Sequence, residues 1–438
     1  MNYDQTLSYI MRQLPMYQRT GIAAYRTGLD NTLKLDEYFR QPHRHFKTVH
    51  VAGTNGKGSV SHMIASILQE AGYKTGLYTS PHLVDFRERI RINGTMIPKS
   101  FVAKFINAHK SFFETFDPSF FEISVYMAFE YFKENHADLA VIEVGLGGRL
   151  DATNIITPAL SVITNIGLDH TEILGDTIPK IAVEKAGIIK RNIPVVIGET
   201  QDVTANVFND IASKMAAPIT YADNHYKIDY SLMSVDGCQV FNVRKNDEVR
   251  YPNLKCGLLG TYQKKNVVTV LCAIEKLASL DEANPLLLKD SHIYSGIKKV
   301  VTNTGLAGRW QVVRHKPQVV CDTAHNYEGI KVVLQQIRET AHNKLHMVLG
   351  FVNDKDLTEV MKILPLNADY YFVRLSVPRT MDEKDLALTA ATKGIRGKSY
   401  TGIDFAYNDV LTKAKENDLV VITGSNFLVA DFFITNLI

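Results

Sequence analysis

The chain has 438 residues, of which 45% are hydrophobic and 22% charged, values that exclude a largely disordered protein. At about 150 residues per domain, this length predicts two or three domains, none of which needs a disulfide or a metal ion to fold. A net charge of +3 without a block of Lys or Arg argues against a nucleic-acid coat, and no apolar run approaches the roughly 18 residues of a membrane span.

The N-terminal residues and the cysteines indicate a compartment. The first segment, MNYDQTLSYIMRQ, contains Asp4 and lacks the apolar stretch of a secretory signal. Cys238, Cys256, Cys272 and Cys321 have no CxxC spacing, which predicts reduced core residues rather than a zinc site or a disulfide framework. We therefore expect a soluble cytoplasmic protein that interacts with neither nucleic acid nor membrane.

Strands and helices alternate through the first part of the chain. Residues 48–52 predict a strand, and after a glycine loop the apolar residues from Val60 to Ala71 recur at helical spacing, with Gly72 as the C-cap. Further apolar runs at 139–144, 160–166 and 193–197 do not alternate, as is typical of parallel strands covered on both faces. This pattern predicts a mostly parallel, doubly wound α/β sheet with ligands at the carboxyl ends of its strands.

The pattern changes in the second half. Residues 226–260 are polar and contain an Asp236-Gly237 turn, which predicts a β-hairpin. Helical spacing returns near residues 266–277, and few apolar positions are in phase over 290–308. We place a domain boundary near Gly296, giving domains 1–296 and 297–438 with a ligand cleft between them. The second domain is expected to be α/β, with strands at 318–321, 346–349, 370–375 and 419–422 and helices from Tyr327, Asp356 and Asn426.

A glycine-rich loop joins the first predicted strand to its helix. Glycines let backbone N–H groups approach an anion, the helix N-terminus is electropositive, and Lys57 adds a charge for the β- and γ-phosphates. The strict Walker pattern fails, because Val51 stands where it needs glycine and Gly58 separates Lys57 from a hydroxyl. A tight strand–helix connection is the alternative. We predict phosphate binding by Thr54, Asn55, Gly56, Lys57, Gly58 and Ser59.

Three residues near strand ends are candidate metal ligands. Glu143 ends an apolar strand, where an unpaired carboxylate would be costly unless it faces a cation; a structural salt bridge is the alternative. His170 follows the next predicted strand at the same sheet edge, although a loop histidine is often structural. Ser80 also closes a strand, but its residue type alone favours a turn cap before Pro81.

Lys185 is flanked by small and apolar residues in IAVEKAGII. Most helical lysines are solvated. A partly buried lysine has a lowered pKa and is a better nucleophile, also toward CO₂.

The motifs HVAGTNGKGSV, TSPHL, IEVGLGGRLDATN, GLDHTEILG, EKAGIIK, GRW and DTAHN occur in this order. Together they resemble the folylpolyglutamate synthase family of Mur ligases, whose bacterial members often also have dihydrofolate synthase activity. The resemblance extends from about Gly28 to Leu428. It implies a P-loop ATPase domain joined to a smaller Mur-type α/β domain, in a monomer that uses ATP, two Mg²⁺ ions, L-glutamate and a folate or dihydropteroate, and it leaves K⁺ open as a further cation.

The resemblance also implies roles for individual residues. Ser80 and Glu143 match the ligands of one magnesium, and His170 and a carbamylated Lys185 match those of the second. Nucleotide contacts match Asn266, Arg309 and Asp322, and glutamate-binding positions match His325 and Ser425. Positions near the pterin match Phe121, Glu122, Arg149 and Asp151.

The implied reaction transfers the γ-phosphoryl group of ATP to a folate carboxylate, and the glutamate amine then attacks the acyl phosphate. Lys57, Lys185 and His170 are the expected catalytic residues, and Lys57 and Arg309 would neutralise phosphoryl charge. Two alternatives share the loop: a small-molecule kinase, whose product keeps the phosphoryl group, and a switch ATPase, whose turnover would ignore glutamate.

Overall fold

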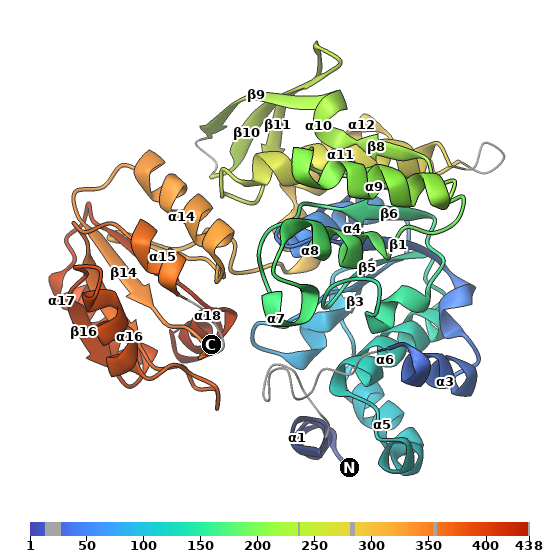
Figure 1. The fold of residues 1–438 in the computed structure, drawn as a ribbon, viewed down its shortest axis with the longest axis horizontal. Coiled ribbons are helices and arrows are strands. Elements are labelled where there is room, and N and C mark those ends of the chain that lie inside the picture. The colour runs from blue at the N-terminus through green and yellow to red at the C-terminus, as the bar shows by residue number, and fades with distance from the viewer. Residues whose placement is uncertain (14–27, 235–236, 281–284, 354–356, 437–438) are drawn as a thin grey trace. The chain divides into compact units, whose positions relative to one another are not determined.

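A computed structural model describes the chain except for residues 14–27, 235–236, 281–284, 354–356 and 437–438 (Figure 1). The described residues form two compact units. Unit 1 contains residues 1–82, 86–257 and 262–306, and unit 2 contains residues 83–85, 258–261 and 307–438. None of the helices in these described parts is long and apolar enough to cross a membrane.

The expected boundary near Gly296 falls inside a helix of unit 1, at residues 290–298. Gly296 packs so closely against the backbone of Ile67 that an added Cβ would lie 2.5 Å from the Cα atom of Ile67. Ser66 Oγ also donates to the Gly296 carbonyl at 2.6 Å. This packing holds the segment in unit 1, and the long stretch of unit 2 begins only at Ala307.

Unit 1 is built on an eight-stranded sheet with the order β4-β3-β2-β5-β1-β6-β7-β8. Its strands are β1 Lys47–Ala52, β2 Thr75–Tyr78, β3 Ile90–Ile92, β4 Thr95–Met96, β5 Leu139–Glu143, β6 Leu160–Ile163, β7 Val195–Ile197 and β8 Ile219–Tyr221. The six strands from β2 to β8 in this order pair in parallel, whereas β3 pairs antiparallel with β2 and β4 pairs antiparallel with β3. The predicted mostly parallel sheet is therefore confirmed.

Helices cover both faces of this sheet (Figure 1). The α-helices of unit 1 are α1 Tyr3–Gln13, α3 Asp30–Tyr38, α4 Lys57–Glu70, α5 Lys99–Phe116, α6 Phe120–Glu134, α7 Thr171–Leu174, α8 Ile178–Ala186, α9 Asp202–Lys214, α10 Ala222–His225, α11 Gln263–Ala278, α12 Asp290–Lys298 and α13 Val300–Thr304. Short 3-10 helices are η2 Pro42–His45, η3 Phe86–Arg89 and η4 Ala152–Ile155. The central strands are covered on both faces, and most of their residues are accordingly apolar; Thr48, His50 and Ser161 are buried polar exceptions.

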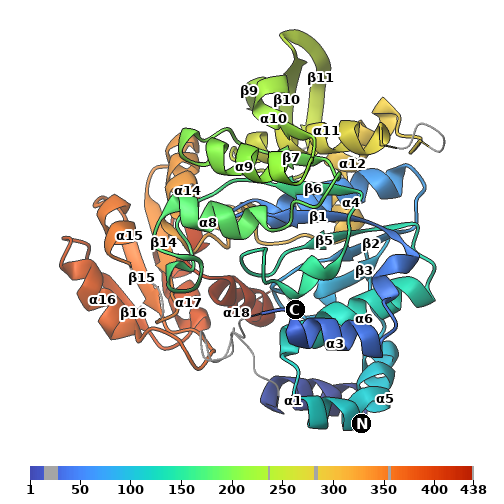
Figure 2. The same cartoon turned by 45° about the vertical axis from the view of Figure 1, so that its right-hand side comes forward.

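The polar stretch after β8 forms a separate antiparallel sheet of three strands, β9 Tyr226–Met233, β10 Gln239–Lys245 and β11 Glu248–Cys256. The predicted hairpin therefore gains a third strand. Its second turn contains Asn246 and Asp247, both with positive φ, a conformation that these short polar residues tolerate. Part of the predicted Asp236-Gly237 turn lies outside the described residues. Figure 2 shows this sheet standing out beyond α10 and α11.

Unit 2 has a six-stranded sheet with the order β12-β13-β17-β14-β15-β16, parallel except for β12 at the edge. Its elements are β12 Gln311–His315, β13 Gln318–Cys321, α14 Tyr327–Glu339, β14 Leu345–Leu349, α15 Thr358–Ile363, β15 Asp369–Val373, α16 Glu383–Ala391, β16 Gly397–Tyr400, α17 Ile403–Lys413, β17 Leu419–Thr423 and α18 Asn426–Asn436. The helices predicted from Tyr327 and Asn426 are confirmed, whereas Asp356 lies outside the described residues.

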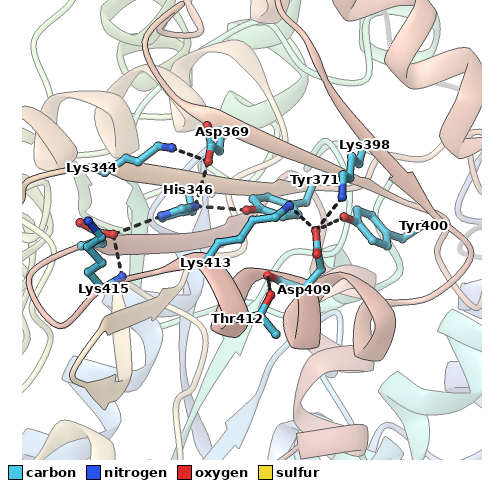
Figure 3. Close-up of polar contacts among 11 residues, drawn as sticks. Lys344, His346, Asp369, Tyr371, Lys398, Tyr400, Asp409, Thr412, Lys413 and Lys415 are labelled. Carbon is cyan, nitrogen blue, oxygen red and sulfur yellow. Dashed lines mark hydrogen bonds and ion pairs between the residues drawn. The ribbon is translucent and has the colours of Figure 1, made fainter.

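A buried histidine lies at the amino ends of the strands of unit 2 (Figure 3). His346 Nδ1 is 3.2 Å from the Tyr371 hydroxyl and 3.6 Å from Asp369 Oδ2, and its Nε2 is 3.5 Å from Asp418 Oδ2. Burial lowers the pKa of His346 below 6.5, and this effect outweighs the two aspartates, which raise it. The folded chain therefore favours a neutral imidazole at this position.

We expect this histidine to make unit 2 less stable in mild acid. Below its ordinary pKa of 6.5 the unfolded chain binds a proton at His346 before the folded chain does, so stability falls as the pH falls. The free energy of unfolding of the unaltered protein should decrease more steeply between pH 7 and 5 than that of His346→Gln, by up to about 1.4 kcal/mol per pH unit. If denaturant titrations showed the same change in the free energy of unfolding with pH for both proteins, this role of His346 would be contradicted.

Candidate active site

The loop between β1 and α4 is held in one shape by its glycines and by the end of β6. Gly53 and Gly56 have φ of +143° and +88°, which favour glycine. Thr54 N donates to the Asn165 carbonyl at 2.9 Å, and Thr164 Oγ1 donates to the Asn55 carbonyl at 2.6 Å. The loop leads directly into α4, so the helix N-terminus and its N–H groups lie beside it, as anion binding requires.

Gly53 has no room for a side chain. A Cβ would lie 1.9 Å from Thr164 Oγ1, and Thr164 is only 2% exposed and cannot easily move. We expect Gly53→Ala to lower the free energy of unfolding by about 2 kcal/mol or more and to weaken ADP binding, because the positive φ and the clash act together. Denaturant unfolding and ADP titration would measure both effects. Gly72→Ala is the matched control, since it has positive φ but nothing within 4 Å.

Two lysines converge on one carbonyl oxygen of this loop. Lys57 Nζ donates to the carbonyls of Gly53 and Thr54 at 3.0 and 3.2 Å. Lys185 Nζ, from α8, donates to the same Gly53 carbonyl at 2.9 Å. Lys185 is 4% exposed, and its pKa is lowered to about 7 by burial and then by the positive charge of Lys57, partly offset by Asp169 and Asp151. A substantial fraction of Lys185 is therefore a neutral amine near neutral pH.

Lys185 also lies against the loop that follows β5. A Cβ on Gly148 would be 3.1 Å from Lys185 Cα, and one on Gly187 would be 2.3 Å from Arg149 Cβ. Arg149 N donates to the Glu184 carbonyl at 2.7 Å, and the Arg149 guanidinium pairs with the Glu184 carboxylate at 2.8 Å. The structure thus brings Lys185 and the phosphate loop together and gives Arg149 a protein partner.

Ser80 and Glu143 are neighbours at the carboxyl ends of β2 and β5. Ser80 N donates to Glu143 Oε2 at 3.0 Å, and Glu143 is 4% exposed. Arg89, itself 2% exposed, adds a positive charge near this carboxylate and donates to His82 Nδ1 at 2.8 Å. A carboxylate beside a serine supplies oxygen ligands of the kind that Mg²⁺ prefers.

His170 is the N-cap residue of α7 and has a positive φ of 50°, and its Nε2 is 3.8 Å from Asp169 Oδ2. Asp169 also influences the charge of Lys185, so these residues share one region. Across the described ranges, no three His, Cys, Asp or Glu side chains gather as a metal site would require. A second metal ion at His170 would therefore need a ligand of another kind.

The residues expected near the pterin differ in environment. The Phe121 ring packs on Gly145, where a Cβ would be 2.3 Å from Phe121 Cζ. Glu122 accepts from Ser119 N at 2.8 Å and from Thr32 Oγ1 at 3.2 Å, which makes it part of the cap of α6. Asp151 accepts from Leu146 N at 2.8 Å and Thr153 N at 3.0 Å, and burial raises its pKa. Glu122 and Asp151 thus shape the backbone of this region.

Asn266 on α11 lies against the phosphate loop, since a Cβ on Gly56 would be 2.3 Å from Asn266 Oδ1. Its Nδ2 donates to Gln263 Oε1 at 2.7 Å, and Gln263 Nε2 donates to Ser59 Oγ at 3.3 Å. Asn266, which the resemblance matches to a nucleotide contact, therefore lies against the loop between β1 and α4.

In unit 2, the expected residues gather at the carboxyl ends of β13 and β17. Asp322 accepts from Trp310 N and Ala324 N, both at 2.9 Å, and Arg309 donates to Thr323 Oγ1 at 2.5 Å. His325 Nδ1 is 3.0 Å from the Thr323 carbonyl, and Gly424 N donates to the Ala324 carbonyl at 3.0 Å, next to Ser425. Because β13 and β17 pair in parallel, Asp322, His325 and Ser425 lie at one sheet edge.

Comparison with known proteins assigns both units. The Mur ligase middle domain matches residues 51–274, and the Mur ligase glutamate ligase domain matches residues 308–426. The dihydrofolate synthase/folylpolyglutamate synthase of Bacillus subtilis is 34% identical over 426 residues, covering 93% of this chain and 94% of that protein. The chain belongs to the folylpolyglutamate synthase/dihydrofolate synthase family of Mur ligases.

Solved structures of proteins from this family have folds similar to that of this chain. Escherichia coli FolC in complex with DHPP and ADP has a TM-score of 0.82 and 28% identity, covering 99% of this chain and 97% of that one. A bifunctional folylpolyglutamate synthase/dihydrofolate synthase with Mn, AMPPNP and L-glutamate bound has a TM-score of 0.83 and 26% identity, covering 100% and 98% of the two chains.

Sequence patterns missed several polar residues of this folylpolyglutamate synthase family member. Arg89 lies in a short arginine-rich segment of a kind that is typical of a solvated surface. In the structure it is buried, and its guanidinium lies over the Phe120 ring, 5.1 Å from the ring centroid. Asn165 and Glu199 follow β6 and β7 and hydrogen-bond each other at 2.9 Å. Their positions just after buried strands were the available signal, because the carboxyl ends of neighbouring parallel strands meet at one edge.

Proposed function

We propose that this chain is an ATP-dependent ligase that joins L-glutamate to the γ-carboxylate of a folate through an acyl phosphate. The observation that carries the proposal is the glycine loop at the start of α4, with Lys57 folded over it and buried Lys185 on the same carbonyl. The names of the relatives support the substrates: one structure holds DHPP with ADP, and another holds an ATP analogue with L-glutamate. A kinase or a switch ATPase is not favoured, because neither needs a glutamate ligase domain.

Each unit has a proposed part in the reaction. In unit 1, Thr54, Asn55, Gly56, Lys57, Gly58 and Ser59 bind the phosphates through backbone amides and one ammonium group. The ammonium of Lys57 and the guanidinium of Arg309 stabilise negative charge on the transferring phosphoryl group. Asn266 and Asp322 orient the nucleotide, and His325 and Ser425 bind glutamate. Phe121 and Asp151 border the folate, while Glu122 and Arg149 support its surroundings.

The residues present fit one divalent cation directly. Ser80 and Glu143 would hold Mg²⁺, which supplies charge neutralisation on the β- and γ-phosphates. At His170 the fit depends on Lys185, because an ammonium has donors and no acceptor, whereas a carbamate would add two oxygen ligands. K⁺ remains a further candidate cation.

We propose a cytoplasmic monomer, because the expected site residues all come from one chain. Light scattering would test the oligomeric state.

The decisive experiment incubates the protein with Mg-ATP and glutamate and adds dihydropteroate or tetrahydrofolate separately. We expect products heavier by one glutamyl residue, together with ADP and free phosphate, identified by mass spectrometry. A phosphorylated product would indicate a kinase. ATP turnover that does not depend on glutamate would indicate a switch ATPase. The arm with dihydropteroate decides whether dihydrofolate synthase activity is present.

A further inference from the structure

Three polar side chains outside the expected site form a hydrogen-bonded chain beside the phosphate loop. Asn165 follows β6, Glu199 follows β7, and Lys265 lies on α11. Asn165 Nδ2 donates to Glu199 Oε1 at 2.9 Å, and Lys265 Nζ donates to Glu199 Oε2 at 2.5 Å. Both oxygens of Glu199 therefore have protein partners, and its side chain is half-buried, at 20% exposure.

Asn165 is the member of this chain that touches the loop. Its backbone carbonyl accepts from Thr54 N at 2.9 Å, and its side-chain Oδ1 accepts from Asn55 N at 3.0 Å. Two successive loop amides are therefore held by one residue. The direction of the next peptide units, up to Gly56 and the start of α4, depends on these two bonds.

The bond to Asn55 exists in only one orientation of the Asn165 amide. The oxygen and the NH₂ group of an asparagine have nearly the same shape, but only the oxygen accepts a hydrogen bond. Turned over, the NH₂ group would face the N–H of Asn55, and two donors would oppose each other. Ionised Glu199 only accepts hydrogen bonds, so it requires the NH₂ group on its own side and leaves Oδ1 for Asn55.

Close backbone packing brings Glu199 to this position. A Cβ on Gly198 would be 2.4 Å from the Thr164 carbonyl and 2.5 Å from Thr269 Oγ1. Lys265 then holds the second oxygen of Glu199 from the helix that also carries Asn266, the neighbour of Gly56. The chain thus ties α11 and the ends of β6 and β7 to the loop.

We propose that Glu199 is a positioning residue for nucleotide binding, which acts by fixing the orientation of the Asn165 amide and thereby the Thr54–Asn55 segment. The proposal rests on the proposed function only in that this loop binds the phosphates of ATP. Glu199 requires no contact with the nucleotide.

Reciprocal exchange of acid and amide tests the proposal. In Glu199→Gln the amide oxygen accepts from Lys265, which can only donate, so the NH₂ group faces Asn165 and competes with Asn55 N for its Oδ1. In Asn165→Asp two carboxylates face each other. In the double variant the new amide donates its NH₂ group to the new carboxylate, whose other oxygen accepts from Asn55 N, and the amide oxygen still accepts from Lys265. The double variant keeps the net charge of the unaltered protein.

We expect each single variant to weaken ADP binding, measured by calorimetry, by about tenfold, and the double variant to recover most of this loss. The KM for ATP should rise with the Kd for ADP, while the KM for glutamate stays within about twofold. Asp290→Asn, which removes an exposed carboxylate that pairs with Arg250 at 2.7 Å, is the matched control and should bind ADP normally.

Two results would overturn the proposal: unchanged ADP binding in Glu199→Gln, or a double variant that is as weak as the single variants combined. Melting temperatures of all variants separate positioning from general destabilisation, since lost stability alone would raise the KM values of all substrates. ADP binding needs no ligation. A protein that binds ADP but forms no amide would refute the ligase function and still leave Glu199 testable.

Discussion

Lys57→Ala should lower the rate of ligation by about a thousandfold or more while the protein stays folded. The ammonium of Lys57 bonds only to carbonyls of its own loop, at 3.0 and 3.2 Å, among the contacts that the structure describes. Removing it therefore costs little packing. It removes a positive charge from the place where, in the proposed reaction, phosphoryl oxygens gain negative charge. Steady-state product formation and thermal unfolding would measure the two effects separately.

Two further variants sharpen this test. Lys57→Arg keeps the charge but replaces a compact ammonium with a planar fork, so we expect only slight recovery. Lys180→Ala removes an exposed lysine that pairs with Asp176 at 2.9 Å, and it should leave ligation unchanged. Near-normal turnover by Lys57→Ala would remove the basis for assigning the loop to ATP.

Lys185→Ala should also abolish most activity, and small carboxylic acids should restore part of it. The pKa of Lys185 is lowered to about 7, mainly by burial and then by Lys57. A neutral amine attacks CO₂ and loses a proton, which leaves a carbamate with two acceptor oxygens where the ammonium had none. Acetate or formate would occupy the position of those oxygens in the alanine variant.

The pH dependence and the arginine variant follow from the same chemistry. Carbamate formation needs the neutral amine, so we expect activity at limiting CO₂ to fall as the pH drops below about 7. Lys185→Arg should resist rescue, because a guanidinium fills the space with positive charge. Mass spectrometry of the intact protein would detect the added carboxyl group. Full activity of Lys185→Ala would contradict the assignment of a second metal ion.

The sequence was sufficient for the parts of the fold that depend on local periodicity. The apolar runs of β5 and β6 predicted strands that are covered on both faces, and the helical spacing of apolar residues predicted α4 and α11. The position of the domain boundary, expected near Gly296, was harder to predict from the sequence. That segment is polar, and its place in unit 1 depends on contact with Ile67, far away in the sequence.

The candidate site shows the same division. The predictions for Gly53–Ser59 and Lys185 came from local patterns, because glycine spacing and apolar flanks are visible in one stretch of chain. The link between Asn165 and Glu199 joins loops that are separated by a whole strand–helix unit, and nothing in either segment alone indicates the other. Glu122 matched a position near the pterin by resemblance, while its hydrogen bonds to Ser119 and Thr32 required the folded chain.

The cap at the start of α6 has an evolutionary consequence. Glu122 ties that helix start to Ser119 and to Thr32, and the adjacent Phe121 ring packs on Gly145. In the proposed site Phe121 borders the folate, so inherited changes at Ser119 or Thr32 that shift the start of α6 would move this ring without replacing a residue proposed to contact the folate. Selection for a different folate can thus act on a helix cap, so two enzymes with the same residues around the folate can still differ in the folate they prefer.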